Sequence, residues 1–128
     1  MKKLVVLATI VVAALSLAGA AQAGCWATIG ISPLVYDGYA VGKPWVVTVR
    51  VMQHGMTPMR DARPEVRVRS VKTGLIVFKA KPTAKVGSYR ASVVFPKAGR
   101  YSIRVYDGFP VEECAKVTAF GSVVVADV

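Results

Sequence analysis

The residues of this chain that could bind a soft metal ion gather in one short segment. The stretch from Met52 to Met59 holds three of the four methionines and the one histidine of the chain. Thioether sulfur and imidazole nitrogen together favour Cu(I). Met52, His54 and Met56 are spaced two residues apart, so an extended backbone projects them from one face, and Met59 can fold back behind them. The sequence therefore predicts a candidate Cu(I) site made of Met52, His54, Met56 and Met59.

A second interpretation of the same segment needs no metal. Methionine fills irregular gaps in a core, and a single histidine on a loop is usually a solvated surface residue. Arg50, Arg60 and Arg63 flank the cluster, and their positive charge opposes a cation unless nearby acids offset it. Metal binding and packing or partner contact therefore both stay open.

Catalytic chemistry has little to build on in this sequence. With one histidine and two cysteines, any nucleophile–histidine pair would have to use His54, and no nucleophile motif accompanies it. Glu112 and Glu113 are adjacent, so in a strand they point to opposite faces and cannot form a facing acid–base pair. A phosphate-binding glycine loop and a zinc-ligand spacing are both absent from the sequence. We expect a protein without enzymatic activity.

The first residues have the pattern of a secretory signal peptide. Lys2 and Lys3 precede an apolar run from Leu4 to Leu17, and Ala21-Gln22-Ala23 follows with the small residues that signal peptidase recognises. We expect a signal peptide over 1–23 and a mature domain over 24–128, exported to the periplasm, the cell envelope or the medium. An uncleaved anchor, or acylation at Cys25, are the alternatives. The mature chain contains no second stretch of membrane-spanning length.

The two cysteines lie near the two ends of the mature chain. An even cysteine count in an exported domain favours a disulfide, in this case between Cys25 and Cys114. Such a bond would close nearly the whole domain into one loop, which stabilises the fold by ~4 kcal/mol in the loop-entropy model. Lipidation of Cys25 and paired metal thiolates are the other readings.

Alternation of apolar and polar residues recurs along the mature chain, and helical periodicity is absent. Short alternating runs separated by Gly and Pro predict an all-β fold, a seven-stranded antiparallel immunoglobulin-like sandwich. The seven predicted strands are Trp26–Ile31, Trp45–Gln53, Glu65–Val71, Leu75–Ala80, Tyr89–Phe95, Tyr101–Tyr106 and Lys116–Val125.

Two further predictions follow from this order of strands. Gly99-Arg100-Tyr101 has the spacing of the tyrosine corner of such sandwiches, in which the hydroxyl fixes the preceding loop. If consecutive strands run up and down, Cys25 lies at the same end as the loops after the second, fourth and sixth strands. The Met/His segment and Cys114 are then expected at that end as well.

The stretch GSYRASVVFPKAGRYSIRVYDGF, from Gly87 to Phe109, resembles the second half of YtkA-like domains. The shared pattern is Gly-x-Tyr, an alternating strand, a Gly-aromatic turn and another alternating strand. Lys43-Pro44-Trp45 with its following strand, and Asp61-Ala62-Arg63-Pro64 with the next, fit the first half. The resemblance implies a small immunoglobulin-like module of bacterial envelope proteins, related in fold to the CopC-like copper carriers. Some relatives carry Met and His near the loop that holds His54.

The mature chain is strongly basic. Removing Lys2 and Lys3 from the 17 basic residues leaves 15, against 7 acidic residues, for a net charge of +8. Six cations on predicted outward faces form a candidate polyanion-binding face: Arg67, Arg69, Lys79, Lys81, Arg90 and Arg104. Such cations also keep sheet edges from pairing.

Export favours anionic lipid or envelope polymer over nucleic acid as the partner of that face. We expect a binding or accessory module whose partner is an envelope protein or polymer. A Cu(I) carrier is the second reading, and association with anionic surface through the basic faces is the third.

Overall fold

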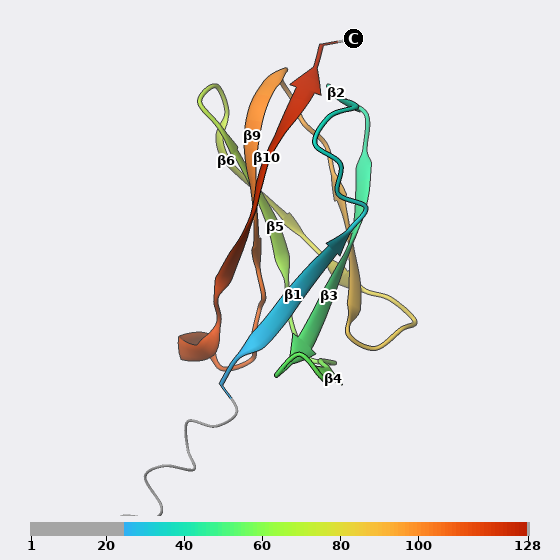
Figure 1. The fold of residues 1–128 in the computed structure, drawn as a ribbon, viewed down its shortest axis with the longest axis vertical. Helices are drawn as coiled ribbons and strands as arrows, with labels where there is room; N and C mark the ends of the chain where they lie inside the picture. Colours follow the sequence, from blue (N-terminus) through green and yellow to red (C-terminus); the bar gives the residue numbers. More distant parts are fainter. Residues whose placement is uncertain (1–24, 128) are drawn as a thin grey trace, which may run out of the picture.

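The computed structural model describes residues 25–127, and the predicted signal peptide lies outside them. The described chain is an all-β sandwich of two packed sheets (Figure 1). Its strands are β1 (Ala27–Ser32), β2 (Tyr39–Ala40), β3 (Trp45–Gln53), β4 (Thr57–Pro58), β5 (Glu65–Ser70), β6 (Gly74–Lys79), β7 (Lys81–Pro82), β8 (Ser88–Val93), β9 (Gly99–Tyr106) and β10 (Val117–Ala126). A short 3-10 helix, η2 (Glu112–Cys114), precedes β10.

The two sheets are named after their central strands. The β3 sheet has the order β1-β3-β8-β7, with β4 also paired to β3, and the β9 sheet has the order β2-β10-β9-β5-β6. Neighbouring strands are antiparallel except β2, which runs parallel to β10. Within residues 25–127 the structure contains no helix long and apolar enough to cross a membrane.

Each of the seven predicted strands corresponds to an observed strand whose limits differ by no more than two residues. The predicted count is too low, because β2, β4 and β7 were not expected. Each of these contains only two residues. A pair of residues is too short to show the alternation on which the prediction rested.

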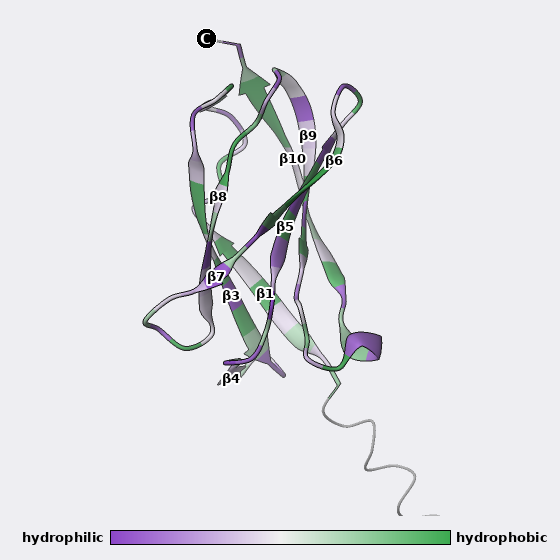
Figure 2. Cartoon of the chain, turned by 180° about the vertical axis from the view of Figure 1, so that it is seen from behind, coloured by the Kyte–Doolittle hydropathy of each residue, from purple (hydrophilic) through white to green (hydrophobic). Residues whose placement is uncertain are grey.

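The core lies between the sheets, and the in-and-out alternation is as expected. Val47, Val49 and Val51 of β3 are fully buried, while the residues between them face outward. Ile103 and Val105 of β9 are likewise fully buried. Figure 2 shows the resulting green and purple bands along the strands. A β-branched residue at every second position suits a sheet with one buried face.

Two buried tyrosines fix loops to strands through their hydroxyl groups. Tyr101 donates to the carbonyl oxygen of Lys97 at 2.7 Å, which is the bond expected of a tyrosine corner. Tyr89 of β8 donates to the carbonyl oxygen of Met59 at 2.6 Å and accepts from the Ala62 amide at 3.2 Å. The Tyr89 bonds tie the connection between β4 and β5 to β8.

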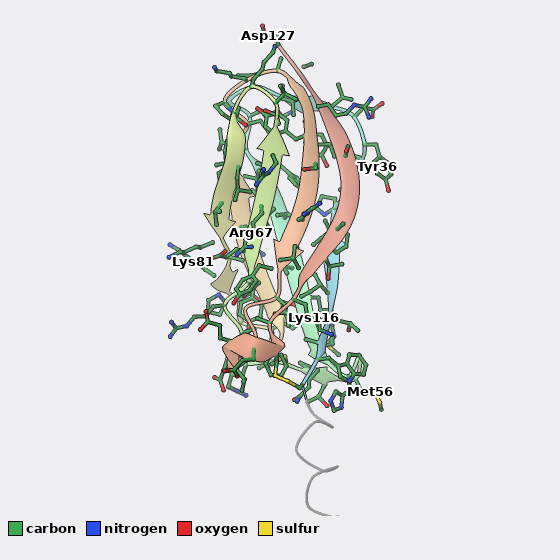
Figure 3. All side chains as sticks on the ribbon, turned by 90° about the vertical axis from the view of Figure 1, so that its left-hand side faces the viewer. Tyr36, Met56, Arg67, Lys81, Lys116 and Asp127 are labelled. Carbon is green, nitrogen blue, oxygen red and sulfur yellow. A yellow bond between two sulfur atoms is a disulfide. The ribbon has the colours of Figure 1, made fainter. Side chains whose placement is uncertain are left out.

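Cys25 and Cys114 form a disulfide, with their Cα atoms 5.2 Å apart and a separation of 89 positions in sequence. The bond lies at the same end of the sandwich as Met56 (Figure 3). The loops at this end touch one another. A Cβ on Gly87 would lie 2.7 Å from the Cβ of Pro58, and the Arg63 amide donates to the Gly108 carbonyl at 3.0 Å. The predicted gathering of these segments at one end is confirmed.

Candidate anion-binding face

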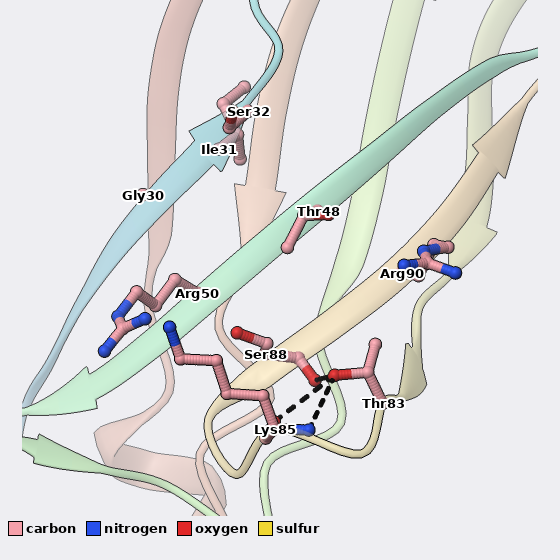
Figure 4. Close-up of a pocket in the computed structure, with 9 residues that line it drawn as sticks. All are labelled: Gly30, Ile31, Ser32, Thr48, Arg50, Thr83, Lys85, Ser88 and Arg90. Carbon is pink, nitrogen blue, oxygen red and sulfur yellow. Dashed lines mark hydrogen bonds between the residues drawn. The ribbon is translucent and has the colours of Figure 1, made fainter.

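The outer surface of the β3 sheet contains a basic hollow of about 480 Å³ (Figure 4). Arg50 of β3, Arg90 of β8 and Lys85 of the β7–β8 loop supply its positive charge. Hydroxyl groups lie between the cations, and the uncharged lining residues are Gly30, Ile31, Ser32, Thr48, Thr83 and Ser88. Guanidinium, ammonium and hydroxyl groups are the donors that bind oxyanions.

Strand register places the two arginines of this hollow. Arg50 pairs with Ser88 and Arg90 pairs with Thr48, so Arg50 and Arg90 are diagonal neighbours on β3 and β8. Both alternate with buried residues, because Val49, Val51, Tyr89 and Ala91 occupy the inward positions. The alternation therefore directs both guanidinium groups away from the core, onto the same face.

Lys85 is held in the hollow by an ordered loop. The Thr83 hydroxyl donates to the carbonyl of Ser88 at 3.0 Å and accepts from the Lys85 amide at 3.3 Å. The Ser88 amide donates back to the carbonyl of Lys85 at 3.0 Å. Figure 4 shows the Lys85 side chain extending from this loop towards Arg50. A loop fixed in this way loses little conformational entropy when Lys85 binds a ligand.

The charge of this face is not neutralised from within the sheet. Strands β1, β3, β4, β7 and β8 contain no Asp or Glu. Among the described residues, Arg50, Lys85 and Arg90 form no ion pair. Lys81 of β7 lies directly opposite Arg90, and like charges in such a position destabilise a sheet. The folded protein therefore carries an electrostatic cost on this face that an anion would relieve.

The six cations predicted to form one polyanion face are divided between the two sheets. Lys81 and Arg90 belong to the β3 sheet, and Lys79 lies beside them at the end of β6. The other three are on strands β5 and β9 of the β9 sheet: Arg67, Arg69 and Arg104. Alternation in a sequence tells which residues face outward, but it does not tell which of two opposite surfaces they share.

The cations of the β9 sheet have a different environment. The Arg67 guanidinium lies 2.8 Å from the Glu65 carboxylate and 4.6 Å from the centre of the Tyr106 ring. The hollow around it contains aliphatic residues as well, with Leu75 48% and Val117 45% exposed. The charge of this second face is therefore partly neutralised by Glu65, and the β3 sheet is the better candidate for anions.

The four residues of the predicted Cu(I) site have very different surroundings. Met59 is buried in the core, with 9% of its surface exposed, and Met56 is 81% exposed at the tip of the turn. Met52 lies half-buried on the outer side of β3, next to the inward Val51. The segment after β4 turns into the core because the Met59 amide donates to the Val51 carbonyl at 3.0 Å. Met59 is thereby separated from the surface that carries Met56.

His54 has an uncommon local structure. Its φ angle is +53°, in the left-handed region, and its ring stacks on Trp26 with the ring centres 4.9 Å apart. The Nε2 atom of His54 is buried and has no hydrogen-bond partner among the described residues. Within residues 25–127, no three His, Cys, Asp or Glu side chains lie close enough together to hold a metal ion. Any metal at His54 would therefore need the methionine sulfurs.

Comparison with known proteins gives no further guide to the site, since neither a family model nor a curated protein matches this chain. Arg50 and Lys85 were not among the residues predicted to form the polyanion face. The outward position of Arg50 was evident from the alternation of β3. Lys85 lies in a loop, where no periodicity shows which way a side chain points.

Proposed function

We propose that this chain is an exported, non-enzymatic binding module that holds an anionic partner on the outer face of its β3 sheet. The observation that carries the proposal is the hollow around Arg50, Lys85 and Arg90, which lies on a sheet whose strands contain no acidic residue. Uncompensated cations beside hydroxyl donors, on an ordered loop and two paired strands, form a preorganised surface for oxyanions.

The fold assignment within this proposal is an immunoglobulin-like sandwich of the YtkA-like type. Support comes from the order β1-β3-β8 in one sheet facing β10-β9-β5 in the other, and from the parallel pairing of β2 with β10. The tyrosine corner at Tyr101 is a further hallmark of such folds. The disulfide between Cys25 and Cys114 is typical of proteins outside the cytoplasm. An envelope polymer or surface therefore fits the proposal better than nucleic acid.

The test is retention of the domain on an immobilised phosphate polymer, poly(glycerol phosphate), over a range of salt concentrations. Replacing Arg50, Lys85 and Arg90 by Gln should abolish retention at physiological salt, because each removes a charged donor from the hollow. The matched control replaces Arg69, Arg100 and Arg104 by Gln, which removes the same charge from the β9 sheet. Equal weakening by both triple variants would refute a defined site, since it would mean that only net charge matters.

A Cu(I) carrier is the second candidate function, and the unpartnered Nε2 atom of His54 is the observation in its favour. We infer that such a site would use Nε2 with the sulfurs of Met52 and Met56. Met59, being in the core, would not take part. In a titration with a competing Cu(I) chelator, Met52→Leu and Met56→Leu should then weaken binding while Met59→Leu leaves it unchanged. The absence of any binding, or equal effects of all three variants, would rule out this site.

A further inference from the structure

A second hollow adjoins the first on the face of the β3 sheet. It measures about 880 Å³, and Thr83, Lys85 and Arg90 line both. Beyond these shared residues the second hollow contains two more cations, Lys79 and Lys81. The two hollows therefore lie side by side, and together they form the depression that extends from Arg50 on β3, past Arg90 on β8, to Lys81 on β7.

Three cations of this depression form a row across neighbouring strands. Lys81 is paired with Arg90 across β7 and β8, so their Cβ atoms are roughly 5 Å apart. Arg90 is a diagonal neighbour of Arg50, at a distance of about 7–8 Å. Three cationic side chains thus leave the backbone one after another across three strands, with attachment points at steps of roughly 5–8 Å. Figure 4 shows the guanidinium groups of Arg50 and Arg90 on opposite sides of the first hollow, so a single oxyanion does not contact both.

We infer that this row binds a linear polymer with repeating phosphodiester groups, successive phosphates contacting Arg50, Arg90 and Lys81. The inference rests on the proposed function, and it adds the class of ligand. Each phosphate offers several oxygens, which suits the mixture of guanidinium groups with the hydroxyls of Thr48 and Ser88 in the first hollow. A depression crossed by a diagonal row fits an extended chain better than the flat surface of a lipid bilayer.

The test measures the affinity of the full mature domain for glycerol phosphate, its trimer and its hexamer by calorimetry at low salt. An exposed ion pair adds up to about fivefold in affinity, so two further contacts should make the trimer about 25-fold tighter than the monomer. The hexamer should gain only about twofold to threefold more, because three phosphates already fill the row. A trimer that binds no more tightly than the monomer would overturn the inference.

The Lys81→Gln variant distinguishes binding along the whole row from binding in the first hollow alone. Lys81 does not line the first hollow, so the variant should bind the monomer normally and the trimer about fivefold more weakly. Lys116→Gln, which removes an exposed lysine that precedes β10, is the matched control and should leave both affinities unchanged. Loss of trimer affinity in both variants would contradict a specific row.

Two further arms distinguish the ligand class. A galacturonate hexamer that binds as tightly as the phosphate hexamer would overturn the phosphate assignment. Tighter capture by phosphatidylcholine vesicles containing one quarter phosphatidylglycerol would overturn the polymer in favour of a membrane surface. Failure of the inference can be told apart from failure of the proposed function. If the hollow binds a single anion only, the monomer still binds and only the inference fails. If the protein binds none of the probes, both the inference and the proposed function are refuted.

Discussion

Replacing Tyr89 by Phe should destabilise the domain through lost hydrogen bonds alone. The ring is 2% exposed and packs in the core, and Phe retains that packing. The hydroxyl makes two bonds to the connection between β4 and β5, at 2.6 Å with the Met59 carbonyl and 3.2 Å with the Ala62 amide. Each net hydrogen bond is worth about 1 kcal/mol, and leaving buried partners unsatisfied adds to this, for a total of about 2–3 kcal/mol.

Tyr101→Phe is the matched comparison, because its ring is also fully buried but its hydroxyl makes one bond, to Lys97. We expect a loss of about 1 kcal/mol there. In a domain of this size, 1 kcal/mol corresponds to about 4–8 °C in Tm, so Tyr89→Phe should lower Tm by about 10–20 °C. Urea unfolding and calorimetry measure both quantities. If Tyr89→Phe lowers the unfolding free energy no more than Tyr101→Phe does, the stabilising role of the two Tyr89 hydrogen bonds is refuted.

The same variant has a signature at alkaline pH. Burial raises the pKa of Tyr89, an effect larger than the opposing hydrogen bond from Ala62. The unfolded chain then ionises first, so this contribution to stability is complete below about pH 10 and declines as pH rises through the folded-state pKa. Tyr89→Phe should therefore flatten the loss of unfolding free energy between pH 9 and 11. An unchanged slope would contradict the burial effect. Burial also raises the pKa of Tyr39, so a smaller decline of the unfolding free energy should remain in the variant.

Two other perturbations test the frame that supports the basic face. Replacing Cys25 and Cys114 by Ser opens a loop of 89 residues, for which the entropy model gives about 4–5 kcal/mol, measured by urea unfolding with and without reductant. A loss below about 1 kcal/mol would contradict that model. Gly108→Ala should cost about 3 kcal/mol or more, because φ is +64° and a Cβ would overlap the backbone of Arg63. Gly38→Ala, with positive φ but open space around it, should cost only about 1 kcal/mol, and equal losses would refute the role of the close approach.

The strands and their inward faces could be predicted from the sequence because period-two alternation is a local property. Val47 and Val49 had to share a face whatever their partners were. The tyrosine corner was predictable for the same reason, since Tyr101 bonds to a residue only four positions earlier. The disulfide was predicted as the leading alternative because an even cysteine count in an exported domain favours one, and the direction of the strands brings Cys25 and Cys114 to one end.

The candidate site was harder to predict because it depends on which strands share a sheet. Arg90 and Arg104 both alternate outward, yet they lie on opposite sheets. Only the pairing of β8 with β3 and β7 brings Arg90 together with Arg50 and Lys81. Met59 was predicted to fold back towards Met52, His54 and Met56, and a backbone bond to Val51 directs it into the core instead.

An NMR titration of the isotope-labelled domain with the glycerol phosphate trimer would locate the anion-binding face directly. We expect saturable shifts of the backbone amides around Arg50, Lys85 and Arg90, with little change around Arg69 and Arg104. These shifts should disappear when the first three cations are replaced by Gln. Shifts spread over both sheets, or centred on the β9 sheet, would contradict the assignment of the β3 sheet as the binding face.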